Sequence, residues 1–324
     1  DILITGGNRG GGKANSYATP VVTPNGFKLM GELKIGDKVI TPWDGIQKVT
    51  NIYEQGVRRC YVFHFDDGTT STVMPEHRFL VGKPGCEEYT VMMAKEILNH
   101  YKLGGQGMYA LREGETEFYE IPLPPPVIFE NGITMEKLPI HPHVLGMASA
   151  FGYYEFSKYG LGMGRYDRTM YKHLYATGLF FKIVGKHGYA TGIPDDARKK
   201  ITSRRTKIPA FIPDEYMYAD VESRISFVQG VFYMNAHSMR SHQCGSILYI
   251  KLPNKKYINQ LAQMCRSLGW WANVIEERDA LDGQSYWKMV LKATDERIPG
   301  RCVVKAKFAN LKLIAPTPQS KDDI

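Results

Sequence analysis

A glycine-rich segment near the start of the chain has the spacing of a phosphate-binding loop. Residues 7–13 fit the pattern G-x-x-x-x-G-K, and the apolar run Ile2-Leu3-Ile4 precedes them as a buried strand would. Such a loop needs a Ser or Thr after its lysine to hold Mg²⁺, and then a helix whose amides face the phosphates. This chain has Ala14 instead, and the later run Pro20-Val21-Val22 favours a strand. We therefore expect the interrupted loop to bind no nucleotide.

The residues after Lys13 resemble the opening of an intein, the self-excising domain of protein splicing. The resemblance rests on a small residue at a junction, Ala14, on the turn Thr23–Gly26 and on the segment Gly31–Ile40. It implies a mostly-β Hint splicing domain with its scissile junction after Lys13. Residues 1–13 would then belong to a host protein, and their loop resembles that of a phage terminase large subunit. The alternative is a diverged nucleotide-binding enzyme, which requires a helix after Lys13.

A second block, Ser71–Leu80, resembles the intein segment that supplies a histidine to the first splicing step. In that step a Cys or Ser attacks the preceding peptide bond, and an imidazole must protonate the departing nitrogen. The resemblance assigns this role to His77. Met74 replaces the usual Thr, and Ala14 stands at the nucleophile position without a group that can attack. We expect the chain as given not to splice.

The identity of residue 14 admits two interpretations. We interpret Ala14 as an engineered replacement of the nucleophile. The alternative is a natural intein that begins with Ala, in which the downstream nucleophile attacks directly.

Two segments further along the chain, His141–Tyr153 and Arg224–Ala236, resemble the signature helix of the LAGLIDADG homing endonucleases. In that family the two helices pack against each other, and small residues let their backbones approach. Gly146 and Gly230 fall at matching positions, whereas Met234 is bulky. The resemblance implies an α+β endonuclease-like domain with pseudo-two-fold repeats. The alternative is that both segments are core helices of an unrelated domain.

The metal-binding positions of that family are altered here. Each signature helix normally ends in an Asp that holds a divalent cation for phosphodiester hydrolysis. Phe151 and Asn235 occupy these two positions. We therefore predict no metal site, no cofactor and no cutting activity. An active Mg²⁺-dependent nuclease remains an alternative, and it would have to use other acids such as Glu155 or Asp167.

DNA binding can outlive the loss of cutting, and one basic run is the candidate for it. A run of this kind is usually a solvated face, but in this family lysine and arginine contacts to phosphate contribute much of the affinity. A pure DNA-binding module derived from an endonuclease is therefore the rival function. The predicted DNA-binding residues, within a stretch that holds no acid, are Arg198, Lys199, Lys200, Arg204, Arg205 and Lys207.

Composition is compatible with these expectations. The 324 residues carry a formal charge of +8 and are 43% hydrophobic, which is ordinary for a globular protein except for the basic excess. No run of 18 apolar residues occurs, so we expect no membrane partner. The five cysteines are odd in number and have no C-x-x-C spacing. Reduced thiols in the cytoplasm of a phage-infected bacterium fit them best.

Local patterns predict the remaining elements. Strands are expected where apolar residues alternate between turn signals, and helices where they recur at helical spacing. The expected strands are 48–53, 60–65 and 301–308, the expected helices are 92–101 and 257–268, and a hairpin is expected from 270–276 and 285–292.

Together these patterns predict four parts. Residues 1–13 are expected to be an extein remnant, 14–125 the N-terminal part of a Hint domain and 126–298 a degenerate endonuclease-like domain. Residues 299–324 are expected to return to the Hint domain. The usual terminal His-Asn does not occur, so a split or truncated intein is expected, with a C-terminal intein fragment as its partner.

Overall fold

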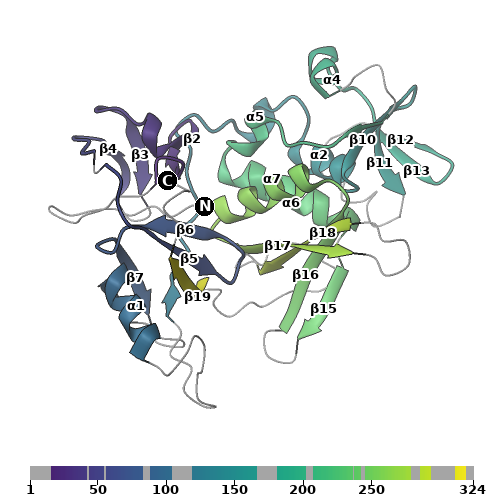
Figure 1. Ribbon diagram of the computed structural model, residues 1–324. Helices are drawn as coiled ribbons and strands as arrows, with labels where there is room; N and C mark the ends of the chain where they lie inside the picture. Colours follow the sequence, from purple (N-terminus) through teal and green to yellow (C-terminus); the bar gives the residue numbers. More distant parts are fainter. Residues whose placement is uncertain are drawn as a thin grey trace. The chain divides into compact units, whose positions relative to one another are not determined.

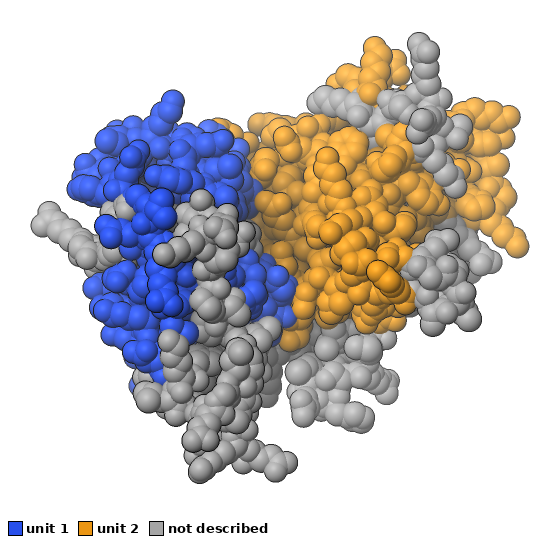
Figure 2. All heavy atoms as spheres, in the orientation of Figure 1, with its two compact units in different colours: residues 1–127, 310–324 blue, residues 128–309 orange. Residues whose placement is uncertain are grey.

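The computed structural model divides the chain into two compact units (Figures 1 and 2). Unit 1 comprises residues 1–127 and 310–324, and unit 2 comprises residues 128–309. The structure describes residues 16–41, 44–54, 56–82, 88–103, 119–165, 181–201, 207–235, 237–241, 245–278, 285–292 and 311–318.

Unit 1 begins with two short antiparallel hairpins whose turns contain glycine. Gly26 and Gly45 have φ angles of 116° and 64°, a region that L side chains avoid. The Asn25-Gly26 and Asp44-Gly45 dipeptides therefore fix where each hairpin turns. The elements are β1 (Pro20–Thr23), β2 (Gly26–Leu29), the 3-10 turn η1 (Met30–Glu32), β3 (Lys38–Thr41) and β4 (Gly45–Lys48).

A six-stranded sheet forms the rest of unit 1, in the order β6-β5-β19-β9-β7-β8. Its members are β5 (Tyr61–Phe65), β6 (Thr70–Val73), β7 (Arg78–Gly82), β8 (Tyr89–Met93), β9 (Glu120–Ile121) and β19 (Leu311–Pro318), and α1 (Ala94–Leu103) follows β8. β19, which follows unit 2 in the sequence, lies between β5 and β9 (Figure 1). Phe63, Phe65 and Phe79 are at most 2% exposed and fill the core of this unit.

In the described part of unit 2, a helix followed by two antiparallel hairpins occurs twice, together with further helices and the strand β14. The first half comprises η2 (Met135–Lys137), α2 (Pro142–Ser149), β10 (Tyr153–Ser157), β11 (Gly160–Arg165), β12 (Phe181–Val184), β13 (His187–Ala190), α4 (Asp195–Ile201), β14 (Lys207–Pro209) and α5 (Asp214–Met217). The second half comprises α6 (Val221–Asn235), β15 (His237–Ser241), β16 (Gly245–Leu252), α7 (Lys255–Ser267), β17 (Trp271–Arg278) and β18 (Ser285–Lys292).

The two sheets of unit 2 have the same strand order, except that the first has an additional edge strand, β14. The first sheet runs β12-β13-β11-β10-β14, and the second runs β15-β16-β18-β17. In each sheet the second strand of the first hairpin pairs antiparallel with the second strand of the second hairpin, β11 with β13 and β16 with β18. In each half the helix that precedes these strands, α2 or α6, belongs to the shared core. The repeat detected in the two helical segments therefore extends to the sheets.

The second half of unit 2 matches the local predictions closely. α7 buries the apolar stripe predicted for residues 257–268, including Ile258, Leu261 and Met264, which have no exposed surface. Burying each such side chain contributes roughly 1.5–3 kcal/mol. β17 and β18 form the predicted hairpin, from Trp271 paired with Lys292 to Arg278 paired with Ser285. Helical periodicity and strand alternation were sufficient to predict this region.

The strand predicted at 48–53 is wrong. β4 ends at Lys48, and Val49 makes its backbone hydrogen bonds with Asp37 and Gly36, both at 2.8 Å. Beyond this point Ile52 is 48% exposed and Tyr53 is 76% exposed. The alternation of residue types in this segment therefore does not correspond to burial of one face.

The helix predicted at 92–101 begins at Ala94, because Met92 and Met93 pair with β7 as the end of β8. The strand predicted at 301–308 lies outside the described residues.

Among the helices that the structure describes, none is long and apolar enough to cross a membrane.

Candidate functional site

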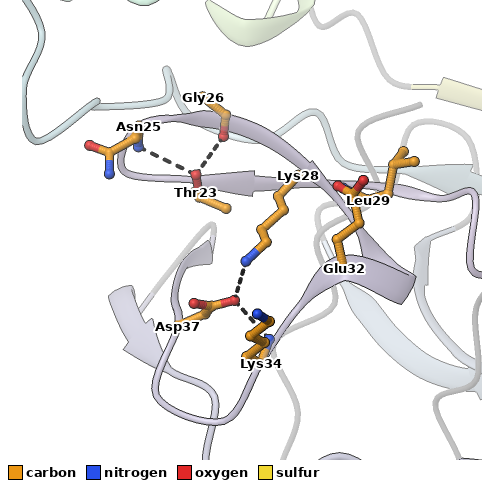
Figure 3. A network of polar contacts seen from close by, with 8 residues as sticks. All are labelled: Thr23, Asn25, Gly26, Lys28, Leu29, Glu32, Lys34 and Asp37. Carbon is orange, nitrogen blue, oxygen red and sulfur yellow. Dashed lines mark hydrogen bonds and ion pairs between the residues drawn. The ribbon is translucent and has the colours of Figure 1, made fainter.

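The segment Gly31–Ile40 is tied to the first hairpin by one carboxylate (Figure 3). Asp37 Oδ2 accepts hydrogen bonds from Lys28 Nζ at 2.6 Å and from Lys34 N at 2.7 Å. These two bonds, first that from Lys28 and then that from Lys34, lower the pKa of the Asp37 carboxyl below its ordinary value. Asp37 therefore holds the turn after η1 against β2, and its role is structural.

The backbone of Met30 and Gly31, where this segment begins, holds the described residues that follow Ala14 in the sequence. Met30 N donates to Thr19 O at 2.8 Å, and Gly31 N donates to Tyr17 O at 3.0 Å. A Cβ on Gly31 would lie 3.0 Å from the side chain of Tyr17, so only glycine fits without a shift. Lys13 and Ala14, the predicted scissile junction, lie outside the described residues.

His77 lies in the turn between β6 and β7 and has no exposed surface. The backbone N–H of His77 donates to Met74 O at 3.0 Å, and this bond closes the turn. The backbone carbonyl of His77 accepts from Ala94 N at 2.7 Å. The imidazole stands edge-on to the Phe79 ring, with ring centroids 4.8 Å apart. Met74 is half-buried in the same turn. The predicted catalytic imidazole is thus enclosed and held in one place within the core of unit 1.

In unit 2 the glycine contact predicted from the sequence is present between α2 and α6. A Cβ on Gly230 would lie 2.0 Å from His143 O and 2.9 Å from Met147 N. A Cβ on Gly146 would lie 2.1 Å from Phe227 O and 3.1 Å from Val231 N. Each glycine thus contacts the residues three before and one after the other glycine. This reciprocal contact is what a two-fold axis between the helices produces.

Phe151 stands just beyond the end of α2 and is 38% exposed. A Cβ on Gly164 of β11 would lie 2.9 Å from Phe151 Cε2 and 2.8 Å from Met234 Cε. Gly164 has a φ of +83° and leaves room for both side chains. Two apolar side chains therefore pack together at the first of the predicted metal positions.

Asn235, at the second of these positions, is the last residue of α6 and bridges to α2. Its amide Nδ2 donates to Ala150 O at 2.8 Å and to Lys251 O at 3.4 Å. Carbonyl groups at the C-terminal end of a helix have no intrahelical partner, and the Asn235 side chain supplies one for the carbonyl of Ala150. The structure thus brings positions 151 and 235 to neighbouring helix ends. In the described part of the chain, no group of three or more His, Cys, Asp or Glu could hold a metal ion.

We expect Asn235→Asp to destabilise unit 2 by about 1–3 kcal/mol. A carboxylate cannot donate, and it would face the carbonyl oxygens of Ala150 and Lys251 that the amide now binds. Chemical denaturation at neutral pH measures the loss. Asn235→Ala, which removes the donor without adding charge, should cost less. Equal losses for the two variants would show that the repulsion is unimportant.

The predicted DNA-binding run is divided between elements. Arg198 and Lys199 are exposed on α4. Lys200 lies in the same helix and Lys207 begins β14, but their side chains are not among those described. The remaining two, Arg204 and Arg205, lie outside the described residues.

The buried cation Arg224 was not singled out as a candidate from the sequence. Its side chain is unexposed and donates to Ala219 O at 3.0 Å and to Ser267 Oγ at 2.6 Å. Burial lowers the pKa of Arg224 to about 10, against the opposing charge of Asp220. The guanidinium lies 4.9 Å from the Phe129 ring centroid. Its position at the start of an apolar helical run was the only available signal, and its role is to join α6 to α7.

Comparison with known proteins supports part of the sequence-based interpretation. No family model matches the chain. The replicative DNA helicase DnaB of Mycobacterium leprae (strain TN) is 30% identical over 79 residues, which are 24% of this chain and 13% of the helicase. The match therefore spans only a small part of the length of that relative.

Among solved structures, the Msm DnaB1 intein splicing domain bound with zinc is similar to about a quarter of the chain, with 29% identity over 25% of this chain and 60% of its own. The TM-score of this match is 0.21.

Proposed function

We propose that the chain is part of an intein, with a splicing domain in unit 1 and a degenerate homing-endonuclease-like domain inserted as unit 2. The observation that carries this proposal is the position of β19. Residues after unit 2 complete the sheet of unit 1 between β5 and β9, so unit 2 is an insertion within one folded domain. A mostly-β domain interrupted in this way is what the resemblance to inteins implies.

The proposed chemistry is an acyl shift at the junction of Lys13 with residue 14. The sulfur or oxygen of a side-chain thiol or hydroxyl at position 14 bonds to the Lys13 carbonyl carbon as the peptide C–N bond breaks. The departing nitrogen receives a proton from His77, and the proton lost by the nucleophile restores the one that His77 gives up. Ala14 has only a methyl group, so the chain with Ala14 does not begin this reaction. The proposed partners are the exteins of a terminase large subunit and a C-terminal intein segment that supplies the later steps.

The proposal is tested by restoring a nucleophile with Ala14→Cys. We expect the variant to release the peptide of residues 1–13 when a small thiol is added, because thiol exchange captures the thioester. Mass spectrometry identifies the peptide, and the chain with Ala14 under identical conditions is the control. A folded Ala14→Cys variant that releases nothing, with its unit 1 thermal transition intact, would contradict the splicing function.

For unit 2 we propose a LAGLIDADG-type fold that binds duplex DNA without cutting it. The shared strand order of its two sheets and the reciprocal contact of Gly146 with Gly230 support the fold. Phe151 and Asn235 support the loss of cutting, since neither supplies the carboxylate that gathers catalytic cations. A DNA-binding module without splicing is the second candidate, and the basic run favours it.

We expect duplex DNA carrying the uninterrupted terminase sequence to shift in a gel and to remain intact with Mg²⁺ or Mn²⁺. Each neutralised phosphate contributes about 0.9 to the slope of log affinity against log salt. Joint replacement of Arg204, Arg205 and Lys207 by Ala should therefore flatten the slope by about two to three. Cleavage at this sequence would contradict the lost chemistry, and no shift at low salt would contradict DNA binding.

A further inference from the structure

The second sheet of unit 2 has one face covered by helices and an opposite face that carries lysines. α6 and α7 lie on one side of this sheet (Figure 1), where Leu248, Ile250 and Met289 are at most 3% exposed. Side chains alternate along a strand, so the residues between them belong to the opposite face. We call that face the outer face, and its residues include Tyr249, Lys251, Glu277 and Lys288.

Two lysines stand directly opposite each other on the outer face. Lys251 of β16 and Lys288 of β18 are register partners across adjacent strands. Like charges at such positions repel each other and destabilise the sheet. Lys288 Nζ also lies 4.9 Å from the Tyr249 ring centroid, which favours a cation there. The outer face therefore concentrates positive charge at one point.

One carboxylate bridges the two ammonium groups. Glu277 Oε2 lies 2.6 Å from Lys251 Nζ, and Glu277 Oε1 lies 3.0 Å from Lys288 Nζ. The side chains of Lys251, Glu277 and Lys288 are 45%, 34% and 17% exposed, so solutes reach the cluster chiefly at Lys251 and Glu277. Hydrogen bonds from Lys251 and then Lys288 lower the pKa of Glu277, and the carboxylate stays ionised at neutral pH.

A phosphate group has the same binding requirements as this carboxylate. Both present two or more anionic oxygens that accept charge-assisted hydrogen bonds from ammonium groups. Because exposed ion pairs contribute little stability, an external anion with several phosphates can compete for the lysines. Displacing Glu277 requires only a side-chain rotation and breaks no covalent bond.

We propose that Lys251 and Lys288 form a phosphate-binding pair and that Glu277 is an internal competitor that lowers its affinity for nucleic acid. This inference rests on the DNA-binding function proposed for unit 2. It differs from that function in assigning an opposing role to an acid on the same surface.

Glu277→Gln in the full chain tests the competitor. We expect a roughly 3- to 10-fold gain in affinity for labelled duplex DNA and for inorganic polyphosphate, the range for one or two released ion pairs. Glu276→Gln is the matched control, because it removes the same charge one residue away, from an exposed side chain on the other face. Its effect on affinity should stay within about 2-fold, because its charge lies on the opposite face from the two lysines and is screened by salt.

Adding Lys251→Ala and Lys288→Ala to the Glu277→Gln variant should abolish the gain and flatten the salt slope by about two. A gain for polyphosphate in a protein that never binds DNA would support the competitor and refute DNA binding. DNA binding that Glu277→Gln leaves unchanged would overturn the competitor alone. Equal gains for Glu276→Gln and Glu277→Gln would also overturn it, and binding of neither anion by any variant would overturn both proposals.

Discussion

In the Ala14→Cys background, His77→Ala is expected to slow thiol-dependent cleavage after Lys13 by about 10²- to 10⁴-fold, the usual contribution of a positioned acid–base group. The amide nitrogen is a poor leaving group without a proton, whereas the attacking thiol is already reactive at neutral pH. The rate is measured by quantifying the released peptide over time.

The position of His77 explains why the expected effect is large. The backbone of His77 is bonded to Met74 and Ala94, and its imidazole packs against Phe79, so the ring loses little further freedom when it acts. Full burial of the ring also keeps bulk water from taking its place as a proton donor.

A matched histidine separates chemistry from folding. His64 lies on β5 of the same sheet and is half-buried, and His64→Ala should leave the cleavage rate nearly unchanged. Thermal unfolding must be compared for both variants, because removing the buried His77 side chain also leaves a cavity. Cleavage at an unchanged rate in folded His77→Ala would remove this residue from the mechanism.

Gly230→Ala is expected to destabilise unit 2 by about 3 kcal/mol or to force α2 and α6 apart, because overpacking a close contact typically costs 1–3 kcal/mol and occasionally more. The added methyl group would lie 2.0 Å from His143 O, an atom of the backbone that cannot rotate away. Intrinsic helix propensity acts in the opposite direction, since alanine is favoured over glycine by about 1 kcal/mol inside a helix. The sign of the measured change therefore identifies the contact as its cause.

The symmetry of the contact provides a second test. Gly146→Ala would place a methyl group 2.1 Å from Phe227 O and should destabilise unit 2 to a similar degree. Gly185→Ala is the control, because no atom lies within 4 Å of its Cβ and only its φ of +61° opposes the substitution. We expect that control to cost about 1–2 kcal/mol. Denaturation curves and amide exchange of α2 and α6 measure these effects, and a neutral or stabilising result at both helix positions would refute close packing.

Short-range patterns predicted the elements whose burial follows directly from sequence spacing. α7 and the hairpin of β17 and β18 have clear periods, and each element packs its apolar face within the same half of unit 2. The close approach of α2 and α6 at Gly146 and Gly230 was predicted from the resemblance to an endonuclease family, in which small residues let the two helices pack together.

The failed and missed predictions depend on contacts between distant residues. At 48–53 the residue types alternate, but Val49 bonds to Gly36 and Asp37 and no burial follows. The sequence analysis did not identify Glu277 as part of a site. Its partner Lys251 is distant in sequence and is brought close by the pairing of β16, β18 and β17.

The sequence by itself determined the kinds of group at each proposed site. Ala14 has no nucleophile, Phe151 has no metal-binding atom, and Gly146 and Gly230 have no side chain to keep a neighbouring backbone away, because these properties belong to the residues themselves. Only the tertiary structure decided what those groups contact. The bond from Asn235 to Ala150 O and the pairing of β19 inside unit 1 join segments far apart in the chain, and the full burial of His77 depends on how its surroundings pack. Such contacts form in the arrangement that buries the most apolar surface while giving hydrogen-bond partners to the buried backbone groups. The whole chain determines that arrangement, because every segment contributes to both requirements.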